Sequence, residues 1–242
     1  YNSVPVLSKK YPSQEVILGV EPDLIYASMR SAFSDKNAGS RDVLRQMGIN
    51  TYLPPYEHDC KSKIQTQMGE GMIDTMDDIY LELLEMGRIF RVDKKAQAIV
   101  NRMKTDIAGI EKKIAKVSSN PTIYWYDSGT DKPYVGAGDG MPNYIIKKVK
   151  GINIFADLEG GWKTGNWERV LDKDPDIIVL IDAVWSTADE KRQYLQNHPA
   201  LSKLKAVRAK RFVEIPFSYT YPGFRGAAGI RIIAEGVYPE LF

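Results

Sequence analysis

The chain has 242 residues and a mass of 27.3 kDa, which allows one large domain or two lobes of about 120 residues. Hydrophobic residues make up 43% of it and charged residues 26%, a composition that excludes a disordered or low-complexity chain. Because 33 basic and 31 acidic residues are interspersed and give a net charge of only +2, we expect no nucleic-acid partner, which would require a concentrated basic surface.

Six short runs rich in β-branched and aromatic residues predict β-strands. They are Val4 to Leu7, Asp23 to Ala27, Asn50 to Pro54, Thr122 to Tyr126, Asp176 to Ile181 and Arg211 to Pro216. Helical patterns separate the first three of these runs. One begins at Ser13, and the other runs from Ser40 to Met47 and is closed by Gly48. This alternation predicts α/β lobes with mostly parallel sheets, in which the loops after the strands carry the function.

Two consecutive amphipathic helices interrupt the alternation. The first runs from Asp74 to Phe90, and Asp93 is expected to cap the second, which reaches about Val117. At 1.5 Å per residue, about 24 residues span roughly 36 Å. The second helix is therefore long enough to join two lobes, and a packing helix of a single domain is the less favoured alternative on periodicity alone.

The order and spacing of several segments are similar to those of a known family. The segments are Glu15-Val-Ile-Leu-Gly-Val-Glu-Pro-Asp-Leu-Ile-Tyr26, Leu83 to Ala98, Gly151-Ile-Asn-Ile-Phe-Ala-Asp157, Trp167-Glu-Arg-Val-Leu171, Asp174-Pro-Asp-Ile-Ile-Val179 and the ending Tyr238-Pro-Glu-Leu-Phe242. Glu-Pro-Asp at 21–23 recurs as Asp-Pro-Asp at 174–176, on either side of the long helix. On these residues the chain resembles the substrate-binding proteins of ABC importers for iron complexes, haem and cobalamin.

The resemblance implies an α/β fold of the class III type, with two Rossmann-like lobes of mostly parallel sheets bridged by a single long α-helix. Residues 1–92 would form the N-terminal lobe, 93–117 the inter-lobe helix and 118–242 the C-terminal lobe. Family members normally begin with a further strand, helix and strand before the part that resembles Val4 to Leu7. We therefore expect an N-terminal lobe that is incomplete relative to the family.

The resemblance also implies a function without catalysis. The chain would be an extracytoplasmic protein, in the periplasm or on the outer face of the cytoplasmic membrane. It would capture an iron complex of the siderophore type between its lobes and deliver it to an ABC permease dimer. Cobalamin, haem, another cofactor-like molecule or an oxyanion are the alternative ligands. A hydrolytic enzyme is a remote alternative, since the chain has no G-x-S-x-G elbow.

The ligand-binding candidates lie on the loops that follow predicted strands. They are Arg30, Tyr56, His58, Tyr126, Ser128, Trp185, Tyr219, Tyr221, Phe224 and Arg225. Arg225 stands among aromatic residues after the last strand, where a guanidinium can grip a carboxylate or phenolate while flat rings stack on a planar ligand. This favours an anionic ferric chelate, with no cofactor. The alternative is that Arg225 pairs with an acid such as Asp139 or Glu235 and the tyrosines only pack.

Two other features have competing interpretations. His58 follows Tyr56 and Glu57, and these three residue types can ligate a metal, although a contact to a chelated complex or plain exposure is favoured over direct ligation. The glycine-rich segment Tyr134 to Pro142 is interpreted as a cleft-lining loop in preference to a structural turn, and it lacks the spacing of a nucleotide-binding motif.

Two acidic residues are expected to contact the permease. Glu15 and Glu168 each lie on a helix just upstream of a Pro-Asp strand, one in each predicted lobe. The resemblance implies that such an acid on each lobe docks with arginines of the membrane permease. The alternative is that they are acids favoured near a helix start by the helix dipole.

Overall fold

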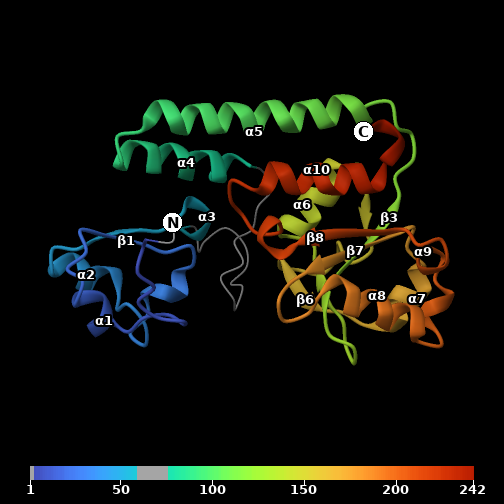
Figure 1. Ribbon diagram of the computed structural model, residues 1–242, viewed down its shortest axis with the longest axis horizontal. Coiled ribbons are helices and arrows are strands. Elements are labelled where there is room, and N and C mark those ends of the chain that lie inside the picture. Colours follow the sequence, from blue (N-terminus) through green and yellow to red (C-terminus); the bar gives the residue numbers. More distant parts are fainter. Residues whose placement is uncertain (1–2, 59–75) are drawn as a thin grey trace. The chain divides into compact units, whose positions relative to one another are not determined.

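The computed structural model describes residues 3–58 and 76–242. By its packing the chain divides into two compact units, residues 1–70 and 71–242. Each unit is described by itself (Figure 1). The division places the two amphipathic helices in the second unit, and the domain limits expected from the sequence, 1–92, 93–117 and 118–242, stay a prediction.

The first unit is a small α/β layer built on two parallel strands. Its elements are α1 (Gln14–Leu18), β1 (Leu24–Tyr26), the 3-10 helix η1 (Arg30–Phe33), α2 (Arg41–Gln46), β2 (Asn50–Tyr52) and α3 (Pro55–His58). The Ser13 and Ser40 hydroxyls accept hydrogen bonds from the Val16 and Val43 amides and so cap α1 and α2. Gly48 follows α2 at φ +81°, the left-handed conformation that ends helices. Both helix starts are as predicted.

The strand predicted at Val4 to Leu7 is wrong. These residues form no strand in the described part of the chain, and Val6 is 84% exposed. In residues 3–58 the sheet consists of β1 paired with β2, in the register Leu24 to Asn50 and Tyr26 to Tyr52. A run of β-branched residues becomes a strand only where a neighbouring strand satisfies its backbone groups, and here none pairs with it.

The second unit has helices on both faces of a mixed sheet. Its elements are α4 (Asp77–Ile89), α5 (Asp93–Ile114), β3 (Thr122–Ser128), β4 (Tyr134–Gly136), α6 (Met141–Lys148), β5 (Ile152–Asn153), β6 (Trp162–Thr164), α7 (Trp167–Lys173), β7 (Ile177–Asp182), α8 (Ala188–Asn197), η2 (Leu201–Lys203), α9 (Lys205–Arg208), β8 (Phe212–Pro216), η3 (Phe217–Tyr219), α10 (Gly226–Val237) and η4 (Pro239–Leu241). Helices α5, α6 and α10 pack on one face, and α7, α8 and α9 on the other (Figure 1).

Within residues 76–242 the sheet has the order β6-β4-β3-β7-β8, with β5 also pairing with β3. Strands β5, β3, β7 and β8 are parallel, and β4 and β6 are antiparallel additions. Residues Ile177 to Ile181 of β7 are buried on both faces, as expected for a central parallel strand covered by two helical layers. The parallel strands predicted from the sequence are confirmed, whereas β4, β5 and β6, of two or three residues each, escaped prediction.

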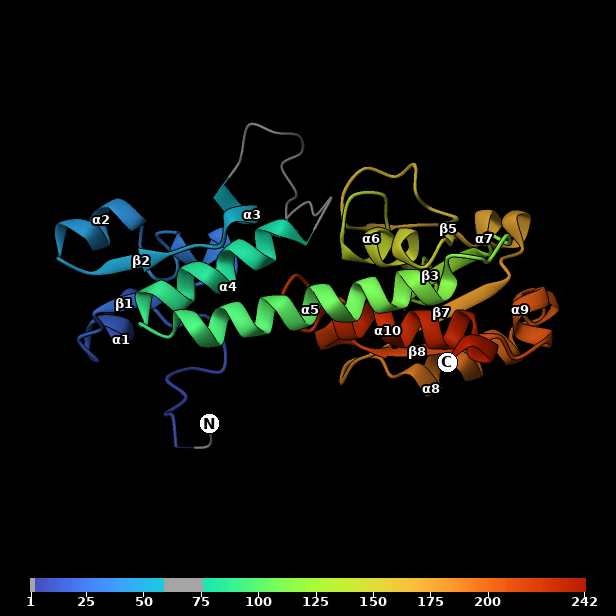
Figure 2. The ribbon, with the colours of Figure 1, turned by 90° about the horizontal axis from the view of Figure 1, so that it is seen from above.

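Helices α4 and α5 form a hairpin whose second helix also packs on α10 (Figures 1 and 2). The buried residues of α5 recur at spacings of three and four from Ala96 to Ile114, which confirms the predicted apolar face. A Cβ on Gly87 of α4 would lie 2.5 Å from the Ala96 Cβ, so glycine permits the close crossing. Asp93 is the first residue of α5 and its side chain makes no cap, contrary to prediction; Val92 occupies the cap position.

The Asp-Pro-Asp motif ties β3 to β7. The Asp176 carboxylate accepts hydrogen bonds of 2.7 Å from both the Thr122 amide and the Thr122 hydroxyl, and pairs with Lys205 Nζ at 2.8 Å. Burial alone would raise the pKa of Asp176, but the hydrogen bonds from Lys205 and Thr122 outweigh it and hold this pKa below its usual value. The charged carboxylate therefore stabilises the fold.

We expect Asp176→Ala to lower the free energy of unfolding by about 1 kcal/mol at neutral pH, since the group is partly solvated. A lowered folded-state pKa contributes stability that is present above the unfolded value of 3.8 and is lost as the pH falls through the folded value. Urea denaturation of wild type and variant should therefore give curves that differ at neutral pH and converge in acid below 3.8. A difference that persists undiminished in acid would contradict this role.

Candidate functional site

A continuous row of aromatic rings lies beyond the carboxyl ends of β7 and β8. The Trp185 ring meets Phe217 edge-on at 4.6 Å between centroids, and Phe217 meets Tyr221 at 4.9 Å. Tyr221 in turn stacks on Trp162 of β6 at 5.1 Å, with an interplanar angle of 18°. We call Trp162, Trp185, Phe217 and Tyr221 the aromatic row. Loops at the carboxyl edge of parallel strands are where α/β sheets bind ligands.

Trp185 is presented by a tight turn between β7 and α8. The Ala183 and Ser186 backbones exchange hydrogen bonds of 3.2 and 3.1 Å, so Val184 and Trp185 are the two central residues. Val184 is 97% exposed and Trp185 59% exposed. Two large apolar side chains held in water at a turn are typical of a binding surface, because nothing in the folding of the unit requires them there.

Arg225 follows Tyr221 of the row by four residues in the chain, and its charge is available. Its guanidinium carbon is 4.6 Å from the Phe224 ring centroid and 5.9 Å from that of Tyr219. The two acids considered as its partners are engaged elsewhere: Asp139 accepts from the Gly160 amide at 2.6 Å, and Glu235 pairs with Arg231 at 3.7 Å. Within the described residues Arg225 has no ion pair, so the alternative of a surface salt bridge is not what the structure holds.

Of the β3 candidates, Tyr126 is corrected by the structure. It is 1% exposed, stacks on Tyr124 at 5.5 Å and donates its hydroxyl proton to the Gly129 carbonyl at 2.9 Å. Burial raises its pKa, so it stays a neutral core residue. We therefore remove Tyr126 from the ligand-binding set. Ser128, the last residue of β3, is half-buried and stays a prediction.

In the first unit, Arg30 is tied to α3. Its amide donates to Glu57 Oε2 at 3.0 Å and its guanidinium donates to the Glu57 carbonyl. Burial raises the pKa of Glu57, and the contacts with Arg30 partly oppose that shift. Arg30 thus fixes the loop after β1 against the loop after β2. Tyr56 directly precedes Glu57 on α3 and is half-buried. The His58 side chain lies outside the described residues.

The first unit also has an apolar pocket of about 260 Å³ at the carboxyl end of β1. It is lined by Tyr11, Pro12, Ile17, Ile25, Tyr26, Ala27, Ser28, Met29, Ala32, Asn37 and Ala38. Across residues 3–58 and 76–242, no group of three or more His, Cys, Asp or Glu side chains is arranged to hold a metal ion. Direct metal ligation by His58 is not tested by this, because its side chain is not described.

Glu15 and Glu168 occupy matching positions. Each is the second residue of a short helix, α1 or α7, that follows a capping side chain, Ser13 or Asn166, and leads into a parallel strand. Both carboxylates are exposed, and neither has an ion pair within the described chain. An acid in the first turn also benefits from the helix dipole. The local structure therefore accounts for an acid at each position and leaves both available for a partner.

The glycine-rich segment at 134–142 is held by backbone hydrogen bonds. Its Ala137, Gly138 and Asp139 amides donate to the Gly161, Leu158 and Gly160 carbonyls at 2.8 to 2.9 Å. A Cβ on Gly138 would lie 2.3 Å from the Ala156 carbonyl oxygen. These amides are used within the protein and do not point at a ligand, which accounts for the segment as a turn. The favoured interpretation of a cleft-lining loop stays a prediction.

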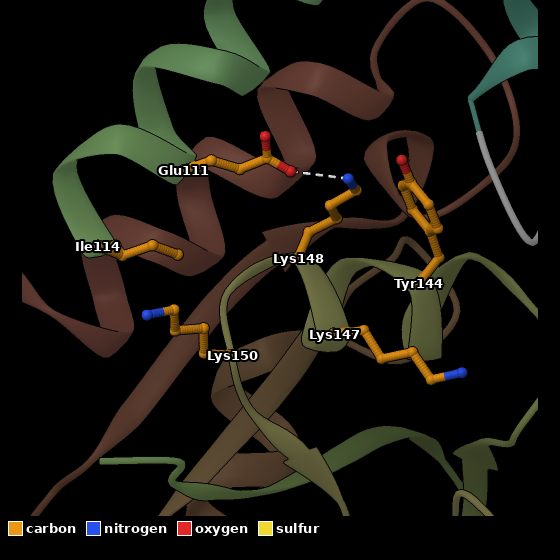
Figure 3. Close-up of a pocket in the computed structure, with 6 residues that line it drawn as sticks. All are labelled: Glu111, Ile114, Tyr144, Lys147, Lys148 and Lys150. Atoms are coloured by element: carbon orange, nitrogen blue, oxygen red, sulfur yellow. Dashed lines mark hydrogen bonds and ion pairs between the residues drawn. The ribbon is translucent and has the colours of Figure 1, made fainter. Parts of the chain in front are cut away.

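A cavity of about 360 Å³ between α5 and α6 is lined by three lysines, Glu111, Ile114 and Tyr144 (Figure 3). Lys148 pairs with Glu111 at 2.7 Å, while Lys147 extends away from that pair. Lys150 donates to the Ala115 carbonyl at 2.7 Å and to that of Val117 at 3.2 Å, which satisfies the end of α5. These contacts hold α6 and the residues after it against α5, and their role is structural.

Sequence reasoning missed two members of the aromatic row. Phe217 directly follows Pro216, so its place after a predicted strand was a usable signal. Trp162 belongs to β6, a strand too short to be predicted, and only its ring contact in the folded structure reveals that it lies beside Tyr221. No helix in the described residues is long and apolar enough to cross a membrane.

A family model described as periplasmic binding protein matches residues 2–219. The chain belongs to this family. Its members are extracytoplasmic binding proteins of transport systems and not enzymes, so the family, fold class and location predicted from the sequence are confirmed.

Relatives of the family agree with this assignment. An uncharacterized ABC transporter substrate-binding lipoprotein of Bacillus subtilis, YvrC, is 25% identical over 231 residues, which are 94% of this chain but only 66% of that protein. The structure of a periplasmic binding protein from Veillonella parvula is 24% identical, with a TM-score of 0.82 over 99% of this chain and 78% of the other. That of an ABC-type Fe3+-hydroxamate transport system from Saccharomonospora viridis is 23% identical, with a TM-score of 0.71 over 97% and 75%. At these identities the two structures show the shared fold.

Proposed function

We propose that this chain is the substrate-binding component of an ABC importer and that it captures a ferric chelate of the siderophore type. The observation that carries the proposal is the aromatic row in the loops after β7 and β8, together with the exposed Arg225 that follows it in the same loop and has no ion pair within the described residues. The family supplies the class of protein, and the side chains at this edge suggest the class of ligand.

The chemistry of the edge suits an anionic ligand with flat or conjugated parts. Hydroxamate, catecholate and carboxylate oxygens around ferric iron carry negative charge that a guanidinium can meet with two parallel hydrogen bonds. The rings of Trp185 and Phe217 offer faces and edges against which the organic part of such a chelate can pack. A relative whose structure is described as an Fe3+-hydroxamate transport system adds support from outside the chain.

The same surface allows a second class of ligand. A flat macrocycle such as haem, or the corrin of cobalamin, could lie against Trp185, which is 59% exposed. Its carboxylates or side chains would then meet Arg225. The two classes differ in size and charge, so a direct binding comparison separates them.

The experiment is a tryptophan fluorescence titration with ferrichrome, ferrioxamine B, ferric enterobactin, haemin and cyanocobalamin. We expect saturable quenching by a ferric chelate with a dissociation constant of about 1 μM or below, a typical affinity for a preformed site. Trp185 is the expected reporter, since it is exposed to solvent whereas Trp125 is fully buried. The Trp185→Phe variant should lose most of the signal while it still binds by equilibrium dialysis.

The outcomes separate the proposals. Binding of haemin or cyanocobalamin alone would keep the substrate-binding role and replace the ligand class. Absence of binding to all five molecules, by fluorescence and by dialysis, would contradict the proposed ligand class.

We further propose that delivery involves Glu15 and Glu168. Their matching positions on α1 and α7, their exposure and their lack of an ion pair in the described chain support a docking role. Charges of one sign on each unit would set the orientation and the encounter rate with a basic surface of the permease dimer.

A further inference from the structure

Lys191 is a buried cation at an unfavourable place. It lies in the first turns of α8 (Figure 1), and only 2% of it is exposed. Burial disfavours its charged form, and the helix dipole disfavours a cation near a helix start. Burial accordingly lowers its pKa, while Asp127, Asp182 and Glu190 act in the opposite direction. A side chain that is costly on two counts calls for a compensating role.

The contacts of Lys191 all lead to the turn that presents Trp185. Its Nζ donates to the Ile181 carbonyl at 2.7 Å, to the Ser186 carbonyl at 2.6 Å and to the Thr187 carbonyl at 3.3 Å. Ile181 precedes the turn, while Ser186 and Thr187 follow its tip. One ammonium group thus closes the turn from below, at both ends.

Apart from the paired backbones of Ala183 and Ser186, few contacts in the described chain hold the tip in place. Val184 is 97% exposed, and Trp185 touches the rest of the row through one edge-on contact with Phe217. The other anchors lie at the base of the turn: the Ala188 amide donates to Asp182 Oδ1 at 3.1 Å, and Thr187 and Glu190 form a capping box that starts α8. Those contacts fix the start of α8, whereas the Lys191 ammonium binds carbonyls closer to the tip on both sides, Ile181 before it and Ser186 after it.

We propose that Lys191 is a positioning residue for ligand binding, which holds the Val184–Trp185 turn in its binding conformation from beneath the surface. The part of this inference that concerns ligand affinity rests on the proposed function. The part that concerns the turn does not. A turn ordered in advance binds with less loss of conformational entropy, so the effect on affinity arises without contact between Lys191 and the ligand.

The test compares Lys191→Met with the control Lys203→Met. Methionine keeps an unbranched side chain in the buried position and removes all three hydrogen bonds, whereas Lys203 is exposed on η2. Hydrogen–deuterium exchange should show the amides of residues 182–188 exchanging at least about tenfold faster in Lys191→Met and unchanged in Lys203→Met. Acrylamide should quench the fluorescence of Trp185 more strongly in Lys191→Met than in wild type. The signal of the other tryptophans, measured in Trp185→Phe, is subtracted.

Affinity provides the second readout. The dissociation constant for the ferric chelate that binds wild type should rise about tenfold in Lys191→Met and stay constant in Lys203→Met. If Lys191→Met does not fold, Lys191→Gln carries the test, because its amide can still donate to two of the three carbonyls and should give an intermediate effect. Unchanged exchange at 182–188 in a folded variant would overturn the inference.

The two proposals fail separately. If no chelate binds wild type but the turn loosens in Lys191→Met, the ligand proposal fails and the structural role of Lys191 stands. If a chelate binds wild type and Lys191→Met with equal affinity while the turn loosens, the turn is ordered by Lys191 but does not limit binding, and the inference is overturned.

Discussion

Arg225→Ala is expected to weaken the binding of a ferric chelate by about 10- to 100-fold, the equivalent of one lost charge-assisted interaction. The guanidinium rests on Phe224 and Tyr219, and it has no ion pair in the described residues. Its removal therefore subtracts a contact with the ligand and leaves no buried charge unpaired. We expect the thermal unfolding temperature to change little, because Arg225 is exposed.

Two further variants make this result specific. Arg225→Lys keeps the charge but loses the planar fork, so a bidentate contact predicts an affinity between those of wild type and alanine. Arg208→Ala removes another exposed arginine, from α9, and it should bind as wild type does. Equal weakening in Arg225→Ala and Arg208→Ala would mean that net charge, and not a contact at the aromatic row, governs affinity. Unaltered affinity in Arg225→Ala would remove Arg225 from the site.

The fold was predictable where burial and periodicity coincide. Strand β7 is a run of five apolar residues that is covered on both faces, and α5 repeats apolar residues every three or four positions along 22 residues. Strands β4 and β6 have three residues each and pair only with β3 or with each other. Their existence depends on pairing across the sheet, which no local pattern contains. The same dependence explains the error at Val4 to Leu7, an apolar run without a strand to pair with.

The site was predictable in its location and less so in its members. The rule that function lies after parallel strands led to Trp185, Tyr221 and Arg225. It also led to Tyr126, which is buried in the core and stacks on Tyr124. Lys191 could not have been found from sequence. A lysine in the first turns of an amphipathic helix is normally solvated, and only the three carbonyls around its Nζ identify it as an internal anchor.

Reversal of both docking acids, Glu15→Lys with Glu168→Lys, is expected to reduce uptake of the bound chelate through the permease at least about tenfold. The change replaces attraction to a basic surface by repulsion on each unit, and it lies at helix starts that retain their capping side chains Ser13 and Asn166. Each single reversal should have a smaller effect than the double reversal. The measurement is transport of an iron-55 chelate into proteoliposomes that contain the cognate permease.

A control of equal charge decides whether position or net charge matters. Asp35→Lys with Glu159→Lys changes the net charge by the same amount, again with one exposed acid in each unit. This pair should transport as wild type does. Ligand affinity should be unchanged in both pairs, because the docking acids act after capture. If the two pairs lose transport equally, or if Glu15→Lys with Glu168→Lys transports normally, these acids only serve their helix starts. Electrostatic attraction strengthens at low salt, so the transport defect of Glu15→Lys with Glu168→Lys should grow as the ionic strength falls. A defect specific to this pair that becomes smaller at low ionic strength would also contradict docking by opposite charges.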